Sequence, residues 1–142
     1  MKKFDINKAL KLFAEYSVML EEMTKTQKII DGSYDKKKNK AIYSKLNKLV
    51  WQIVELDLEA FITLLDDANI VVAEMAAEYL FPFFPRKCLV IMNNYLKTLN
   101  NELDIHKMEL KIKGLREKQP FFMERYFKMF KCDDLSKLNR EK

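Results

Sequence analysis

A chain of 142 residues, 33% charged and 49% hydrophobic, has the size of one folded domain and can bury about two thirds of its unfolded surface without disulfides or metals. Two glycines and three prolines are too few for the many turns of an all-β fold. The commonest residues are good helix formers, and apolar residues recur at helical spacing. We therefore predict one all-α domain over residues 1–142.

The net charge of +5 is unevenly distributed along the chain. Residues 1–48 carry 12 Lys and 6 acids, residues 49–85 carry no base and 7 acids, and residues 86–142 carry 14 bases and 8 acids. The basic total suggests an anionic partner, whereas the central segment suggests a basic one.

The sequence also predicts where the protein is located. No run approaches the roughly 20 apolar residues that span a bilayer, and no signal-peptide core follows the N-terminus. Cys88 and Cys132 fall in different segments and are expected to be free thiols in a reducing compartment. We predict a cytoplasmic protein that does not contact a membrane.

Residues 1–55 are expected to form two long helices. Asp5 is positioned to cap the first, which should end at Gly32, and Asp35 to cap the second. The predicted core positions of the first helix are Ile6, Leu10, Phe13, Tyr16, Leu20, Met23, Gln27 and Ile30. Those of the second are Ile42, Tyr43, Leu46, Leu49, Val50 and Ile53, with Trp51 packing at the edge of the stripe.

Residues 56–85 form the stretch around which we expect the chain to be organised. Asp57 is predicted to cap a short helix, and either Asp67 or Asn69 to cap a second helix over residues 70–80. The second helix is apolar almost all the way round, so it should be buried between neighbours. Two prolines follow it, and Pro85 can open the next helix.

Residues 56–119 should continue as short antiparallel helix pairs, with Asp104 capping the last helix and Gly114 weakening it. Residues 120–142 contain an aromatic helix and a polar end that we expect to be frayed. The aromatic helix either folds back onto the last pair, which its apolar content favours, or stays exposed for a partner. The architecture is either a small HEAT-like or armadillo-like α-solenoid or an irregular helical bundle.

Few residues suggest catalysis or metal binding. His106 is flanked by Glu102 and Glu109 at helical spacing, but one histidine and two glutamates on a Lys-rich helix are more typical of a solvated face. Cys88 falls on an apolar stripe, which indicates a core position. No phosphate-binding loop or hydrolase motif occurs. We therefore predict a protein that is not an enzyme, with no catalytic residue, metal or cofactor.

Carboxylates in the central stretch are the strongest candidates for a binding site. Two antiparallel helices would bring their polar sides towards one edge, and these sides carry Glu59, Asp66, Asp67, Glu74 and Glu78. An acidic surface of this kind favours fast and specific association with a basic protein. The alternative is that these carboxylates are ordinary solubilising charges.

A second functional hypothesis comes from the Lys-rich segments. Residues 36–40 contain four lysines, and the C-terminal third is also basic. Such segments can hold phosphates, which would make the chain a nucleic-acid-binding helical-repeat protein. The segment lacks arginine and exposed aromatic residues to stack on bases, so this is the less favoured reading.

Part of the sequence resembles the bacterial family called domain of unknown function 2019. Residues 39–56 resemble its second helix, and residues 64–72 its Leu-Leu turn. Ala76, Ala77 and Leu80 match an Ala-Ala-x-x-Leu pattern, and Pro85 with Leu89 a Pro-x-x-Ala-x-x-Leu pattern. The resemblance covers about half of the chain. In this sequence Ile70 replaces the proline of the turn, and the usual arginine is missing.

The resemblance implies a small HEAT-like helical fold. It also implies an immunity protein, because small helical proteins of this kind are often encoded beside polymorphic toxins. The expected partner is then a basic protein such as a cognate nuclease toxin, whose active site the acidic surface would occlude.

Overall fold

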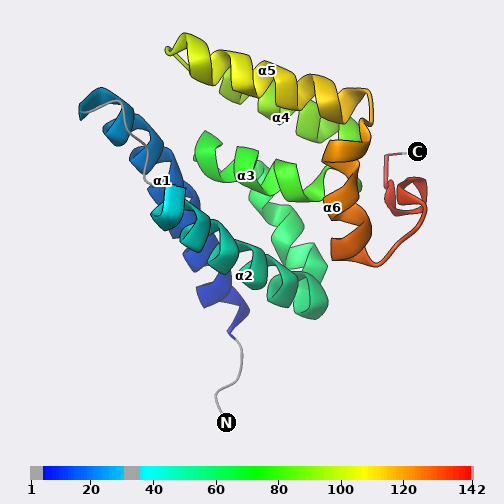
Figure 1. Ribbon diagram of the computed structural model, residues 1–142. Helices are drawn as coiled ribbons and strands as arrows, with labels where there is room; N and C mark the ends of the chain where they lie inside the picture. The colour runs from blue at the N-terminus through cyan, green and yellow to red at the C-terminus, as the bar shows by residue number, and fades with distance from the viewer. Residues whose placement is uncertain (1–4, 31–35, 142) are drawn as a thin grey trace. The chain divides into compact units, whose positions relative to one another are not determined.

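The computed structural model describes residues 5–30 and 36–141, which form an all-helical protein (Figure 1). No β-strand occurs within these two ranges, which confirms the predicted fold class. The elements are α1 (Ile6–Ile30), α2 (Lys36–Ile62), η1 (Thr63–Asp66), α3 (Ile70–Leu80), α4 (Pro85–Leu96), α5 (Glu102–Arg116), α6 (Pro120–Phe130) and η2 (Leu135–Leu138). The predicted helix end at Gly32 and the predicted cap Asp35 lie outside the described residues, as do the side chains of Gln27 and Ile30.

The chain divides into two compact units, Met1–Asp67 and Ala68–Lys142. We call them unit 1 and unit 2. Unit 1 contains the two long helices, of 25 and 27 residues. Unit 2 contains the four shorter helices, of 11 to 15 residues. Helices that follow one another in the chain contact each other within each unit, as expected for helix pairs.

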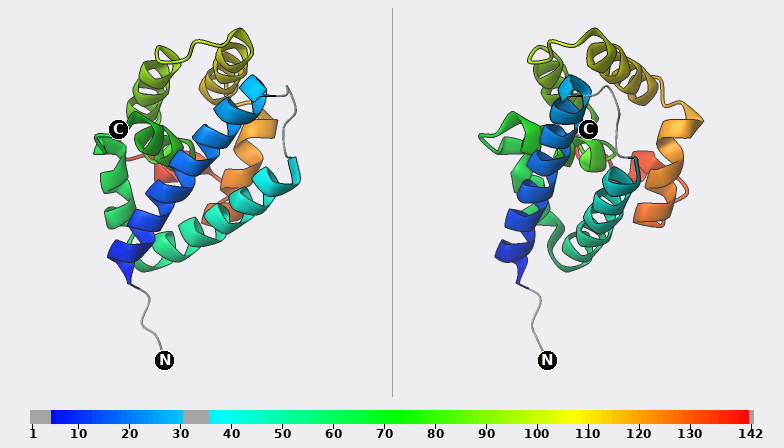
Figure 2. Two further views of the ribbon diagram at one scale, coloured as in Figure 1. Left: turned by 90° about the vertical axis from the view of Figure 1, so that its left-hand side faces the viewer. Right: turned by 60° about the vertical axis from the view of Figure 1, so that its left-hand side comes forward.

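In unit 1, α2 runs back along α1 (Figure 2). Asp5 caps α1 as predicted, because its Oδ1 accepts a hydrogen bond from the amide of Asn7 at 3.0 Å. The rings of Phe13 and Phe61 meet edge to face, with centroids 5.1 Å apart, and both side chains are buried. Residues of the predicted stripes surround them, including Leu20, Leu46, Val50 and Ile53.

A kink at Asp57 divides α2 where the sequence predicts the start of a new helix. The backbone of Asp57 is extended, with φ −159° and ψ 80°. Its Oδ1 accepts a hydrogen bond from the amide of Ala60 at 3.0 Å, so Asp57 is the predicted N-cap. The helix after the kink ends in the 3-10 turn η1 before α3 begins.

In unit 2, side-chain amides cap two helices. Asn69 caps α3, since its Oδ1 accepts from the amide of Val71 at 3.0 Å. The predicted cap of α5 was Asp104, and this is wrong: Asn101 accepts from the amides of Leu103 and Asp104. Asp104 instead lies in the first turn, where a carboxylate still opposes the helix dipole.

Helix α6 folds back onto unit 2 as expected, but it packs against the C-terminal end of α3 as well as against α5 of the last helix pair. Tyr126 is fully buried and stacks between Phe81 and Phe130, with both ring centroids 6.4 Å away. Phe83 meets Phe130 edge to face at 4.9 Å. The aromatic residues on this side of α6 therefore belong to the core of unit 2.

The C-terminal residues are not frayed, contrary to expectation. The carboxylate of Glu141 accepts hydrogen bonds from the amides of Arg86 at 2.7 Å and Lys87 at 2.9 Å. These are free amides in the first turn of α4, whose N-cap residue Phe84 has no side chain that can accept them. The amide of Arg140 also donates to the carbonyl of Phe83 at 2.8 Å. Glu141 thus caps α4 although it lies 55 residues after Arg86 in the sequence.

Gly114 allows α6 to approach α5. A Cβ atom at this position would lie 2.2 Å from two ring atoms of Phe122. The ring of Phe122 therefore lies directly against the backbone of α5. This contact accounts for a glycine in the middle of a helix, which otherwise only lowers helix stability.

We predict that Gly114→Ala lowers the free energy of unfolding. Alanine adds about 1 kcal/mol of helix propensity, but its methyl group must displace Phe122, which typically costs about 1–3 kcal/mol. In a Phe122→Ala background the same substitution should stabilise the protein by about 1 kcal/mol. Urea denaturation of the four proteins measures both effects, and an increase in stability in both backgrounds would contradict the packing role of Gly114.

Glu141→Ala is predicted to destabilise the start of α4. Loss of a helix cap costs about 1 kcal/mol, and the amides of Arg86 and Lys87 should exchange their hydrogens faster with solvent. Glu124→Ala is the matched control, because Glu124 is exposed on α6. Equal exchange rates at both amides in the two variants would show that Glu141 does not cap α4 in solution.

Candidate functional site

The five carboxylates predicted to form one acidic surface lie in different units. Glu59 and Asp66 are exposed and Asp67 is half-buried, all in unit 1. Glu74 and Glu78 lie on α3 of unit 2, where they are buried with only 5% and 8% exposure. The expectation that Glu74 and Glu78 face solvent is therefore wrong.

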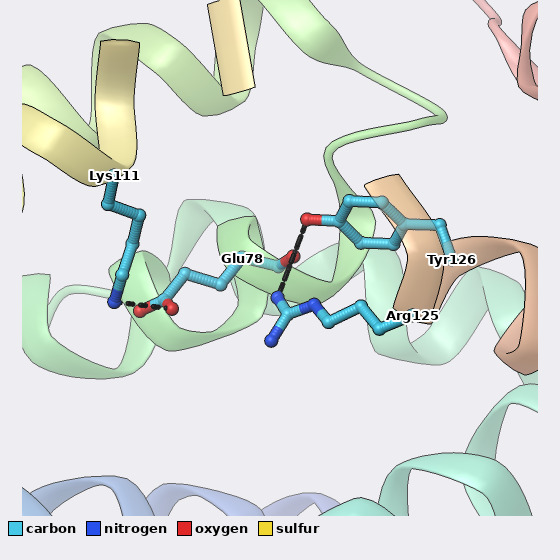
Figure 3. A network of polar contacts seen from close by, with 4 residues as sticks. All are labelled: Glu78, Lys111, Arg125 and Tyr126. Atoms are coloured by element: carbon cyan, nitrogen blue, oxygen red, sulfur yellow. Dashed lines mark hydrogen bonds and ion pairs between the residues drawn. The ribbon is translucent and has the colours of Figure 1, made fainter. Parts of the chain in front are cut away.

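Glu78 is buried because its charge has an internal partner. Its Oε1 lies 2.7 Å from the Nζ of Lys111 on α5, forming an ion pair and a hydrogen bond (Figure 3). The side chain of Glu74, one turn earlier on α3, also hydrogen-bonds to that of Glu78. Because a buried charge is stable only when it is paired, Lys111 makes the buried position of Glu78 tolerable.

The pKa of Glu78 reports the balance of these effects. Burial alone would raise it, but the charge of Lys111, the hydrogen bond with Glu74 and the charge of Arg125 lower it to about 2. Glu78 is therefore ionised at neutral pH.

The backbone of Glu78 is bound as well. Its carbonyl lies near the C-terminal end of α3 and accepts hydrogen bonds from the Nη2 of Arg125, at 2.7 Å, and from the hydroxyl of Tyr126. The guanidinium of Arg125 also lies over the ring of Tyr79, 5.3 Å from its centroid. A cation at this end of a helix is favourable because the last carbonyls carry partial negative charge.

This network of Glu78, Lys111, Arg125 and Tyr126 connects α3 with α5 and α6 (Figure 3). The sequence did not predict Lys111, Arg125 and Tyr126 as partners of Glu78, because they lie 33 to 48 residues away from it. Burial raises the pKa of Tyr126, despite the opposing charge of Arg125 and its hydrogen bond. The hydroxyl of Tyr126 therefore stays protonated and can donate. The arrangement connects three helices of unit 2.

The residues considered for catalysis divide between the surface and the core. His106, Glu102 and Glu109 are all exposed on α5. Across the described ranges, no three His, Cys, Asp or Glu side chains are grouped so that they could hold a metal ion. Burial, with the charge of Glu141, raises the pKa of Cys88 to about 12, despite the opposing charge of Lys87. Its thiol is therefore protonated at neutral pH and a poor nucleophile.

Several exposed acids of unit 1 lie in a segment of the sequence that contains no base. We call residues 49–67 the acidic segment, since it contains five acids and neither Lys nor Arg. Glu55, Glu59 and Asp66 are exposed there. Trp51, predicted at the edge of the core stripe, is 41% exposed and lies one turn before Glu55, and Leu56 is 62% exposed. The acidic segment therefore combines carboxylates with two accessible apolar side chains.

The lysines of residues 36–40 lie in the first turns of α2. Lys38 and Lys40 are in the part whose side chains are described, and both are exposed. The side chains of Lys36 and Lys37 lie outside that part. None of the helices that the structure describes is long and apolar enough to cross a bilayer.

Comparisons of this chain with protein-family models, with curated proteins and with solved structures find no match.

Lys111→Met is predicted to destabilise the protein in a pH-dependent manner. Losing one partner of a buried ion pair costs about 3–5 kcal/mol, and we expect about 2 kcal/mol at pH 7 because Lys111 is 35% exposed. The folded-state pKa of Glu78 is depressed, so the stabilisation is present above pH 4.5 and is lost as pH falls towards 2. The stability difference from wild type should therefore shrink over this range.

Chemical denaturation at pH values from 7 to about 2 measures this difference. Lys113→Met provides the control, because Lys113 is exposed on the same helix and should change stability little at any pH. A constant difference between Lys111→Met and wild type at all pH values would argue against the ion pair with Glu78.

Proposed function

We propose that this chain is a bacterial cytoplasmic binding protein without catalytic activity, and that its partner is a basic protein. In its most specific form, the proposal is an immunity protein that neutralises a cognate toxin by occluding its active site. The resemblance to domain of unknown function 2019 supports this form.

The observation that carries the proposal is the acidic segment. Its exposed carboxylates Glu55, Glu59 and Asp66 lie in a stretch of sequence without any base. Buried Glu74 and Glu78 cannot touch a partner, so we restrict the proposed contacts to Glu59, Asp66 and Asp67. These contacts would steer a basic protein towards the surface and increase the association rate.

Trp51 and Leu56 supply the apolar contact surface that charges alone do not provide. Affinity at protein interfaces is concentrated in a few buried residues, among which tryptophan is enriched. Both side chains are exposed in the unbound protein, and Trp51 lies one turn from Glu55. We therefore expect Trp51 to become buried in the complex while the surrounding carboxylates set the orientation.

Neutralisation requires no chemistry under this proposal. A nuclease must present a basic surface to hold the phosphates of its substrate. A protein that covers this surface with carboxylates excludes the substrate by occupying its place. The same mechanism would serve for any partner whose active site is lined by Lys and Arg.

A tagged pull-down from the native host, with and without nuclease treatment, tests the proposal. One stoichiometric basic protein that remains after nuclease treatment would support it. Recovery of nucleic acid, or of proteins that disappear after nuclease treatment, would instead support phosphate binding by residues 36–40 and the basic C-terminal third.

Charge reversal in the acidic segment is predicted to weaken the complex. The double variant Glu59→Lys/Asp66→Lys should lower affinity for the captured protein by at least about tenfold, mainly through slower association. Glu15→Lys/Glu22→Lys is the matched control, because it introduces the same charge change at exposed positions on α1. Equal affinities of the two double variants would remove the acidic segment from the interface.

A further inference from the structure

Helix α5 exposes two leucines on the side opposite its core contacts. Leu103 is 52% exposed and Leu110 is 50% exposed, whereas Met108, Ile112 and Leu115 are buried. The leucines are seven residues apart, so they lie on one face, separated by about 10 Å along the helix axis. This face is distinct from the acidic segment, which belongs to unit 1.

The apolar surface continues onto α6. The ring of Phe122 lies against Gly114, one turn after Leu110, and so extends the line of the two leucines. Phe121 meets Phe122 edge to face, with centroids 5.3 Å apart, and is 84% exposed. We call these four residues, Leu103, Leu110, Phe122 and Phe121, the apolar strip.

Basic side chains border the apolar strip. Lys107 lies on one side of the two leucines and Lys113 on the other, and both are exposed. The exposed acids Glu102 and Glu109 lie further round α5 on the side of Lys113. Near Phe121 the exposed bases are Lys118, Arg125 and Lys128, with Glu117 and Glu124 as the exposed acids. Bases therefore outnumber acids around the strip, and the charged side chains that directly flank its two leucines are lysines.

We propose that the apolar strip is a docking site for an acidic amphipathic helix of a partner protein. Such a helix presents apolar residues at i, i+3 or i+4, and i+7, which matches the spacing of Leu103 and Leu110. Glutamates on either side of its apolar seam would face Lys107 and Lys113. This site and its acidic partner are additional to the proposed binding of a basic protein.

The width of the strip favours a helix over a membrane surface. Helices that bind membranes carry a wide apolar face with basic residues at its borders. The wide apolar face of α5 is already buried in unit 2 through Met108, Ile112 and Leu115. What remains on the outside is a narrow stripe between Lys107 and Lys113, and a narrow apolar stripe is typical of a seam between two helices.

Fluorescence polarisation of labelled synthetic peptides with the full chain tests the proposal. The probe is a helical peptide of about five turns with leucines in one seam and flanking glutamates. A matched peptide has lysines in place of the glutamates. We expect the glutamate peptide to bind at least about tenfold more tightly than the lysine peptide.

Variants then assign the binding to the strip. Leu103→Ser/Leu110→Ser should lower affinity for the glutamate peptide at least about tenfold, whereas Val90→Ser should leave it unchanged, since Val90 is 59% exposed on α4 outside the strip. Lys107→Glu/Lys113→Glu should reverse the preference between the peptides. Circular dichroism checks that each variant is folded. Neither the leucine double variant nor the lysine double variant should alter binding of a basic partner to the acidic segment.

Several results would overturn the proposal. Absence of peptide binding, or equal binding by wild type and Leu103→Ser/Leu110→Ser, would show that the strip does not dock such a helix. Binding to vesicles containing phosphatidylserine without binding to the glutamate peptide would assign the strip to a membrane surface. A dimer in sedimentation that the leucine variant abolishes, again without peptide binding, would assign it to a second copy of this chain.

Discussion

The structure of unit 2 depends on the burial of α3. This helix is apolar on every side, so all of its faces must be covered, and its residues from Val72 to Leu80 are buried. The only charged side chains within it, Glu74 and Glu78, are buried with the rest. A carboxylate in such a position is stable only with a cation beside it, and Lys111 of α5 provides that cation.

Glu78 also determines where α6 lies. While the side chain of Glu78 pairs with α5, its carbonyl is bound by Arg125 and Tyr126 of α6. Tyr126 in turn fills the space beside the aromatic residues that follow α3. Once α6 is held there, Phe122 lies against Gly114 and an apolar surface forms outside the core. The packing of the interior therefore shapes the surface that we propose as a docking site.

Burial of two acids also changes the distribution of charge on the surface. Without Glu74 and Glu78, the accessible carboxylates of the central stretch are those of the acidic segment in unit 1. The side chains that directly flank the two exposed leucines of α5 are basic, namely Lys107 and Lys113. The acidic segment and the apolar strip therefore differ in the charge beside their exposed apolar residues.

The sequence by itself determined the all-α class and most helix starts, because these depend on contacts within a few residues. Asp5, Asp57 and Asn69 cap helices through amides only two or three positions away. Only the tertiary structure decided that Glu78 is buried and that Glu141 caps α4. Their partners are 33 to 55 residues away, and helical periodicity describes one helix at a time, so it cannot identify which distant side chain will neutralise a carboxylate.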